Sequence, residues 1–275
     1  MSKPSQHSIS ILLPTRGRTT ALKRSIMSLV DLAHNPRELQ ILVGFDTDDS
    51  ASSDYFIEHI APEIDRSGAS YTCMAFEPMG YIRLNEYVNS LAEVATGGWL
   101  MFWNDDAFME SADWDTEIVK HTGRFCCLRM PTHKEHPYAI FPIVPRKWYE
   151  LFGYLSPHQI SDAWISQMSY MLDIMKNIDV KVVHDRHDLT GNNNDETFKN
   201  RPMLEGNHNH PQDFNHDSWR KRRVVDCVTI NTYLKTIDQA TEWFRNVLDG
   251  KQDPWAKMCG PECDPNKQLS QYKTK

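Results

Sequence analysis

The stretch of residues 98–107 constrains the fold more than any other part of the chain. Its five large apolar residues, 99–103, run without a break and end at Asn104, Asp105 and Asp106. A short continuous apolar run of this kind predicts a strand that is buried on both faces of a sheet. Because burying an unpaired carboxylate is costly, we expect both aspartates at the edge of that sheet, facing a crevice.

The three polar residues after this run are compatible with two kinds of structure. Carboxylate and amide oxygens are hard ligands for a divalent cation, and they also accept hydrogen bonds from sugar hydroxyls. The alternative is a polar turn in which Asn or Asp caps the next helix. These residue types alone do not decide between a metal site and a turn.

The first hundred residues alternate between strand and helix patterns. Strands are predicted over residues 8–13, 39–45 and 71–76, and helices over residues 19–31, about 52–64 and 80–95. This order predicts an α/β fold with a doubly wound, mostly parallel sheet. The expected buried side of the third helix carries Ile82, Tyr87, Leu91 and Val94. The glycine-rich motifs of dinucleotide-binding and P-loop proteins are absent, which excludes those two classes.

The turn after the first strand carries Pro14, Thr15, Arg16, Gly17 and Arg18. It follows the carboxyl end of a strand, where open α/β sheets bind ligands. The planar guanidinium groups of its two arginines suit phosphate oxygens. The alternative is a solvated basic turn.

The second strand also ends in acidic residues. Asp46 comes first and could accept hydrogen bonds from a nucleobase or a ribose. Asp48, Asp49 and Ser50 are expected to cap the helix that follows.

The second half of the chain continues with shorter elements. Helices are predicted over residues 111–121, 146–152, 161 to about 176, 218–233 and 237–248, and strands over residues 125–130, 138–144 and 179–183. The helix from Ser161 is expected to be amphipathic, and Pro142 predicts an edge or bulged strand. The last strand ends at His184. The polar stretch 191–217 is long for a loop and suggests a mobile lid, in which Lys199 and Arg201 could meet phosphate.

Charge and cysteine content narrow the class of protein. The net charge of −7 argues against a general nucleic-acid-binding protein, which needs a basic surface. No apolar run approaches the roughly 20 residues that span a bilayer.

The six cysteines form no Cys-x-x-Cys pair, so we expect a reduced, cytoplasmic protein. Cys259 and Cys263 could form a bridge or bind a metal, but a single pair is weak evidence.

Several of these motifs occur together, in a characteristic order. They are Ile-Leu-Leu-Pro-Thr-Arg-Gly-Arg at the first strand, Asp46, Asn89 followed by Ala-Thr-Gly, and Trp-Asn-Asp-Asp at the fourth strand. In this order they resemble a GT-A glycosyltransferase of the family 2 type, over about residues 8–190. The resemblance implies a GT-A (Rossmann-like), mostly parallel central sheet flanked by helices, here with a helical C-terminal extension. It also implies a nucleotide-sugar donor, a UDP-sugar being favoured, and Mn²⁺ or Mg²⁺ as the cofactor.

The resemblance implies a role for each matching residue. The nucleotide-sugar would be bound by residues from the first turn, the second strand, the third helix and the fourth strand: Pro14, Thr15, Arg16, Arg18, Asp46, Arg83, Asn89, Asn104 and Asp105. The metal would be bound by Asp106 and by a histidine after the last strand, His184 in preference to His187. Asp162 matches the general base of inverting GT-A enzymes, and the alternative is that it caps or charges the first turn of its helix.

Three positions depart from the family pattern. Asn104 replaces the first carboxylate of the Asp-x-Asp motif, which removes a charge. Val88 stands where the family often has an arginine, and Arg83, roughly a turn and a half earlier, is the candidate substitute for it. Ser161 replaces the glutamate of the Glu-Asp motif.

The implied domain organisation divides the chain at about residue 215. Residues 1–215 would form the catalytic domain, with a nucleotide-binding half at about 8–106, an acceptor half at about 107–190 and a mobile loop at about 185–217. Residues 216–275 would form C-terminal helices and a tail.

These observations predict a metal-dependent, inverting glycosyltransferase that moves a sugar to a hydroxyl of a carbohydrate or other acceptor. Two alternatives share the fold. A nucleotidyltransferase that makes sugar nucleotides usually has a glycine-rich first loop, and the first loop here is poor in glycine. A carbohydrate-binding protein without turnover is compatible with Asn104 and Ser161, each of which replaces an acid. No nucleic-acid partner and no integral membrane segment are expected.

Overall fold

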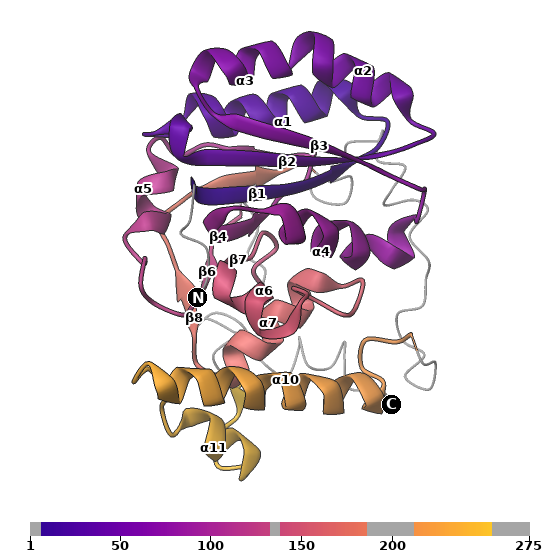
Figure 1. Ribbon diagram of the computed structural model, residues 1–275. Helices are drawn as coiled ribbons and strands as arrows, with labels where there is room; N and C mark the ends of the chain where they lie inside the picture. Colours follow the sequence, from indigo (N-terminus) through magenta and orange to yellow (C-terminus); the bar gives the residue numbers. More distant parts are fainter. Residues whose placement is uncertain (1–6, 133–137, 186–211, 255–275) are drawn as a thin grey trace.

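The computed structural model describes residues 7–132, 138–185 and 212–254 (Figure 1). The first half contains β1 (His7–Thr15), α1 (Thr19–Asp31), η1 (Pro36–Glu38), β2 (Leu39–Asp46), α2 (Ser50–His59), α3 (Ala61–Ser67), β3 (Ser70–Phe76), η2 (Tyr81–Arg83), α4 (Leu84–Val94) and β4 (Gly97–Phe102). The second half contains β5 (Ala107–Met109), α5 (Trp114–Val119), β6 (Cys127–Arg129), β7 (Ile143–Pro145), α6 (Arg146–Phe152), α7 (Ser161–Met171), β8 (Met175–Asn177), β9 (Val182–His184), α10 (Asp217–Thr236) and α11 (Trp243–Leu248).

A seven-stranded sheet with the order β3-β2-β1-β4-β7-β6-β8 forms the centre of the molecule. The strands β3, β2, β1 and β4 are parallel, whereas β7 runs antiparallel to both of its neighbours. Because side chains alternate along a strand, β1 supplies Ile11 and Leu13 to one face and Leu12 to the other. The predicted α/β fold with a mostly parallel sheet is therefore confirmed.

Helices cover both faces of the sheet (Figure 1). On one face, α1, α2, α3 and α5 contribute apolar side chains such as Ile26, Phe56 and Trp114 to a buried core. On the other face, α4, α6 and α7 contribute to a second core, and α10 adds Cys227 and Ile230 from outside α7. Two separate cores on one sheet hold the parallel strands in place, and hence the turns at their carboxyl ends.

A second, two-stranded sheet forms from β5 and β9. These strands pair antiparallel, with Ala107 opposite His184 and Met109 opposite Val182. The pairing brings the end of β9 beside the residue that follows Asp106. It thereby joins two parts of the chain that are far apart in sequence.

The structure corrects several expectations about the second half. β7 lies inside the sheet, and Pro142 precedes it, so this proline does not mark an edge strand. The helix predicted to reach about residue 176 ends at Met171, and the chain then enters β8. That helix, α7, is buried almost all round, because it lies between the sheet and α10, so the expected amphipathic character was wrong.

Helix boundaries in the first half also differ in places. The helix predicted over residues 52–64 is interrupted at Ile60, where Pro62 begins a new first turn, and becomes α2 and α3. The helix predicted over residues 80–95 starts as η2 and continues as α4. Its buried side carries Tyr87 and Leu91 as expected, together with Val88 and Ala92, while Ile82 and Val94 are exposed.

Some predictions fall outside the described residues. These are the lid with Lys199 and Arg201, His187, Cys259 and Cys263, and the tail after residue 254. Among the described residues, no helix combines the length and the apolar character needed to cross a membrane.

Candidate active site

The carboxyl ends of β1, β2 and β4 meet at one edge of the sheet, because these strands are parallel and adjacent. Thr15 ends β1, Asp46 ends β2, and Asp105 follows β4 by three residues. The Thr15 hydroxyl donates a hydrogen bond of 2.7 Å to Oδ2 of Asp105. The first turn and the acidic motif are thus in direct contact, as expected for a ligand site at this edge.

Arg18 joins the two adjacent aspartates. Its Nη2 lies 2.9 Å from Oδ1 of Asp105, and its Nη1 lies 3.2 Å from Oδ2 of Asp106. Asp105 is only 2% exposed, and Thr15 and Arg18 together engage both of its oxygens. One guanidinium therefore faces two carboxylates, which leaves the cluster rich in negative charge.

Asp106 faces His184 on its other side. Oδ1 of Asp106 and Nε2 of His184 are 3.3 Å apart, and both side chains are buried. The β5–β9 pairing sets this approach, and the backbone N–H of Asp185 donates to the carbonyl of Asp106 at 2.7 Å. Burial opposes the ionisation of Asp106, but His184 and Arg18 favour the charged form more strongly, so its pKa is lowered.

The pair of Asp106 and His184 fits a divalent cation. A carboxylate oxygen and an imidazole nitrogen are ligands that Mn²⁺ accepts. Two neighbouring ligands of an octahedral ion with bonds of about 2.1 Å lie about 3 Å apart, close to the observed 3.3 Å. Within residues 7–132, 138–185 and 212–254, no three His, Cys, Asp or Glu side chains form a complete metal site. The other ligands would have to be phosphate oxygens and waters.

Asp46 lies at the same edge and has two side-chain partners. Nη1 of Arg16 donates to its Oδ2 at 2.7 Å, and the hydroxyl of Tyr87 donates to its Oδ1 at 2.5 Å. Arg16 also pairs with Asp48 at 2.9 Å, so Asp48 contacts the first turn rather than the helix it was expected to cap. The Tyr87 contact was not foreseen, because Tyr87 stands in an apolar stripe and reads as a core residue.

Ser25 is a second residue that the sequence did not reveal. Its hydroxyl donates to the carbonyl of Asn104 at 2.9 Å and accepts from the indole N–H of Trp103 at 2.7 Å. It therefore fixes the backbone where the chain leaves β4. The side chain of Asn104 has no hydrogen-bond partner within the described parts of the chain, so its amide can meet a ligand.

The predicted residues Arg83 and Asn89 have other partners. Arg83 pairs with Glu86 at 2.5 Å in the first turn of α4. The Asn89 side chain accepts from the N–H of Leu155 at 2.8 Å and donates to the carbonyl of Ser156 at 2.8 Å. Asn89 thus binds the loop before α7, and Arg83 lies at the surface.

Asp162 lies in the first turn of α7 and is half-buried. The loop before it is held by its own hydrogen bonds, in which the hydroxyls of Ser156 and Ser161 donate to the carbonyl of His158 at 2.7 and 3.2 Å. Of the ion pairs and hydrogen bonds between described residues, none joins Arg83, Asn89 or Asp162 to the cluster around Asp105 and Asp106. Pro14 lies within β1, opposite Gly44 of β2.

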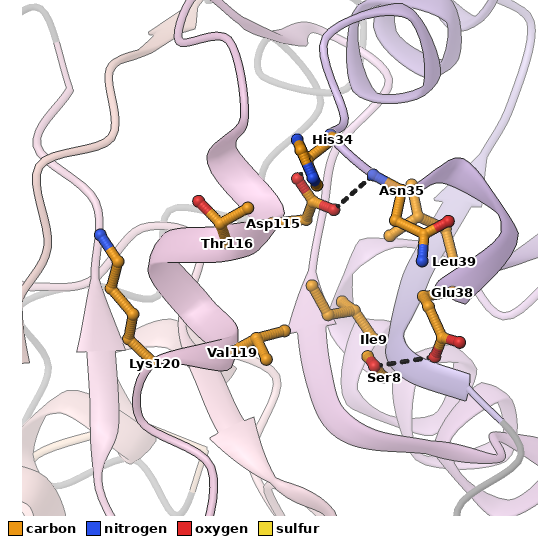
Figure 2. Close-up of a pocket in the computed structure, with 10 residues that line it drawn as sticks. All are labelled: Ser8, Ile9, His34, Asn35, Glu38, Leu39, Asp115, Thr116, Val119 and Lys120. Atoms are coloured by element: carbon orange, nitrogen blue, oxygen red, sulfur yellow. Dashed lines mark hydrogen bonds between the residues drawn. The ribbon is translucent and has the colours of Figure 1, made fainter.

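A cavity of about 560 Å³ lies at the opposite, amino-terminal edge of the sheet (Figure 2). Ser8 and Leu39, near the starts of β1 and β2, line it together with residues of α5. Its buried carboxylate, Asp115, already accepts hydrogen bonds from the backbone N–H groups of His34 and Asn35, at 2.7 and 2.9 Å. This carboxylate serves the local backbone, and the cavity is remote from the cluster of Asp105, Asp106 and His184.

Comparison with known proteins bears on the fold. No protein-family model and no curated protein sequence matches the chain. Among solved structures, a mannosyltransferase from Pyrobaculum calidifontis, PcManGT, in complex with GDP-Man and Mn²⁺ aligns with a TM-score of 0.55 at 12% identity, over 94% of this chain and 74% of that chain.

Structures of TarS from S. aureus align less closely. TarS 1-349 gives a TM-score of 0.45 at 15% identity, and TarS gives 0.49 at 12% identity, each over 65% of this chain. The match spans 58% of the first TarS chain and 37% of the second. The likeness to PcManGT confirms the fold predicted from the sequence motifs: the chain has the GT-A fold of glycosyltransferases.

Proposed function

We propose that this protein is a metal-dependent glycosyltransferase that moves a sugar from a nucleotide-sugar to an acceptor hydroxyl. The observation that carries the proposal is the connected cluster of Thr15, Arg18, Asp105, Asp106 and His184 at the carboxyl edge of the sheet. The fold supports it, because open α/β sheets bind ligands at this edge. PcManGT, which has a similar fold, was solved with GDP-Man and Mn²⁺.

In this proposal Asp106 and His184 hold Mn²⁺ or Mg²⁺. When bound, the ion neutralises charge on the diphosphate of the donor and so makes the nucleotide a better leaving group. Arg18 already balances part of the negative charge of the two aspartates. A divalent cation would offset the remainder and leave the arginines of the first turn free to donate to phosphate oxygens.

The nucleoside of the donor is assigned to the Asp46 side of the edge. Arg16 and Thr15 lie between Asp46 and the acidic cluster, where a diphosphate would connect the two. The Asn104 amide would meet the ribose or the sugar. A UDP-sugar is favoured by the resemblance to family 2 enzymes, and a GDP-sugar is the competing donor class.

Asp162 is assigned the role of general base. It would take the proton of the acceptor hydroxyl while that oxygen bonds to the anomeric carbon and the nucleoside diphosphate leaves with the electrons of the broken C–O bond. One-step displacement of this kind inverts the configuration of the anomeric carbon. The partial exposure of Asp162 supports the assignment, as does the lack of an ion pair or hydrogen bond between its side chain and any other described residue.

The substitution Asp162→Asn tests this role. The amide keeps the shape of the side chain but cannot accept the proton, so turnover of the donor should fall by ~10²–10⁴-fold. Nucleotide affinity should stay within about twofold of the wild type. Turnover is measured as nucleoside diphosphate released from UDP- and GDP-sugars in the presence of Mn²⁺ and a panel of sugar acceptors.

Asp179→Asn is the matched control, because Asp179 is an exposed aspartate with the same change of side chain. Near-normal turnover in Asp162→Asn would refute the assigned role. Pyrophosphate release from a nucleoside triphosphate and a sugar phosphate would favour the nucleotidyltransferase instead. Wild-type protein that binds sugar but consumes no donor would be a carbohydrate-binding protein.

A further inference from the structure

Tyr87 connects helix α4 to the carboxyl end of β2. Its hydroxyl donates to Oδ1 of Asp46 at 2.5 Å and accepts from the backbone N–H of Met79 at 2.7 Å. Nη1 of Arg16 donates to the other oxygen of Asp46 at 2.7 Å. The two partners approach Asp46 from different elements and hold its carboxylate at both oxygens.

The ring of Tyr87 is itself held in place. It packs edge-on against Phe76 at the end of β3, with ring centroids 5.1 Å apart and an interplanar angle of 70°. Phe76 in turn lies against Gly44, where an added Cβ would come within 2.8 Å of Cε2 of the phenylalanine. The absence of a side chain at Gly44 therefore makes room for the ring that supports Tyr87.

Tyr87 acts as a hydrogen-bond donor at neutral pH. Burial raises its pKa above the usual 10, and the hydrogen bond to Asp46 raises it further. The hydroxyl proton consequently remains in place over the whole range in which an enzyme of this kind would work. The hydrogen bond from Tyr87 to Asp46 therefore persists through modest changes of pH.

We propose that Tyr87 is a positioning residue that orients Asp46 to bind the nucleoside of the donor, an inference that rests on the proposed function. A carboxylate oxygen can accept more than one hydrogen bond, so each oxygen of Asp46 keeps capacity for a nucleobase N–H or a ribose hydroxyl. Without Tyr87, the carboxylate could rotate toward the arginine. Binding would then include the cost of restoring the productive orientation.

The test measures the Kd values of UDP, GDP and inorganic pyrophosphate, each with Mn²⁺, by calorimetry. In Tyr87→Phe, the nucleotide that wild type prefers should bind about fivefold to tenfold more weakly, because a hydrogen bond to a charged group is lost. Pyrophosphate lacks a nucleoside, so its Kd should stay within about twofold. Tyr71→Phe is the matched control, since the Tyr71 hydroxyl has no hydrogen-bond partner among the described residues.

A double-mutant cycle with Asp46→Asn separates positioning from general support of the fold. If Tyr87 acts through Asp46, then Tyr87→Phe should have little further effect on nucleotide Kd once Asp46 has been changed. Two additive losses would overturn the proposal. So would an unchanged nucleotide Kd in Tyr87→Phe, or equal weakening of nucleotide and pyrophosphate.

The failure of the proposed function would look different. In that case wild-type protein would bind neither nucleotide in the presence of Mn²⁺. This result would refute the proposed function and the role of Tyr87 together. Binding by wild type that Tyr87→Phe leaves intact would refute the role of Tyr87 alone.

Discussion

Asp105 and Asp106 are neighbours in the chain with different surroundings. Asp105 points back to the first turn, where Thr15 and Arg18 engage both of its oxygens. Asp106 points to β9 and faces His184 at 3.3 Å. Asp105 therefore holds Arg18 in place, and Asp106 is the carboxylate that would bind the cation in the proposed function. Both aspartates lie in the turn between β4 and β5, where the two carboxylates meet different partners.

The buried histidine His158 should make the stability of the fold depend on pH. Its Nδ1 accepts from the N–H of Ile160 at 3.1 Å, and its Nε2 lies 3.1 Å from the carbonyl of Gln212, so the neutral ring fits this site. Burial lowers its pKa below 6.5, and the Gln212 carbonyl opposes this shift only in part. The unfolded chain then binds a proton that the folded chain resists, so stability present above pH 6.5 is lost as the pH falls below that value.

The expected result is a drop in Tm between about pH 7.5 and pH 5.5 that is smaller in His158→Gln than in wild type. His7 and His121 also have lowered pKa values and should account for the drop that remains. Thermal unfolding followed by circular dichroism at each pH measures it. The same drop in both proteins would show that His158 is not the residue that titrates.

At the scale of elements, α4 supports both halves of the site. Tyr87 reaches Asp46 at the donor edge, and Asn89, two residues later, binds the backbone of Leu155 and Ser156 before α7. The loop that Asn89 holds leads directly into the helix that carries Asp162. One helix thus links the strand that bears the proposed nucleoside contact to the helix that bears the proposed base.

Asn89→Ala should loosen this link. The loop loses its side-chain partner while its backbone groups stay partly buried, so the free energy of unfolding should fall by about 1–3 kcal/mol. Hydrogen exchange at the amides of Leu155 and Ser156 should become faster. Asn231→Ala on α10 is the control, because the side chain of that asparagine makes no hydrogen bond with the described residues. If hydrogen exchange at both amides is unchanged and nucleotide binding is weaker, Asn89 has the nucleotide-binding role that its motif predicts and does not hold the loop.

The sequence predicted the elements that have a strong local pattern. The apolar runs identified β1, β2 and β4, and the bounds of α1 and α6 agree with the predicted helices. The residues after these strands lie at one edge of the sheet, because the carboxyl ends of adjacent parallel strands lie at the same edge. These local signals predicted the α/β class and the position of the first turn and Asp105 at one edge of the sheet.

Elements of three residues could not be predicted in the same way. β5 and β8 are too short to show a period, and the place of β7 inside the sheet depends on partners that are remote in sequence. Ser25 and Tyr87 occupy apolar helix stripes, and their hydroxyls meet Asn104 and Asp46, which lie 79 and 41 residues away in the chain. Long-range contacts of this kind cannot be recognised from the local pattern of apolar and polar residues.

At the scale of the molecule, the two halves of the chain meet where β4 pairs with β7. The first half supplies the arginines and Asp46, and the second half supplies His184 and Asp162. On the outer side, α10 is joined to the loop between α6 and α7 by Asp226, which accepts a hydrogen bond from the hydroxyl of Tyr154 at 2.8 Å. A site shared between two halves can align a donor from one with an acceptor from the other.

In the proposed function, Asp106 and a divalent cation together create the donor site. Calorimetric titration of UDP and GDP with Mn²⁺, with Mg²⁺ and with EDTA, on wild type, Asp106→Ala and the exposed-site control Asp54→Ala, tests it most directly. We expect binding that requires the metal, persists in Asp54→Ala and disappears in Asp106→Ala. Tight binding that is unchanged both by EDTA and by Asp106→Ala would refute the metal-dependent donor site. The diphosphate would then be assigned to the arginines of the first turn.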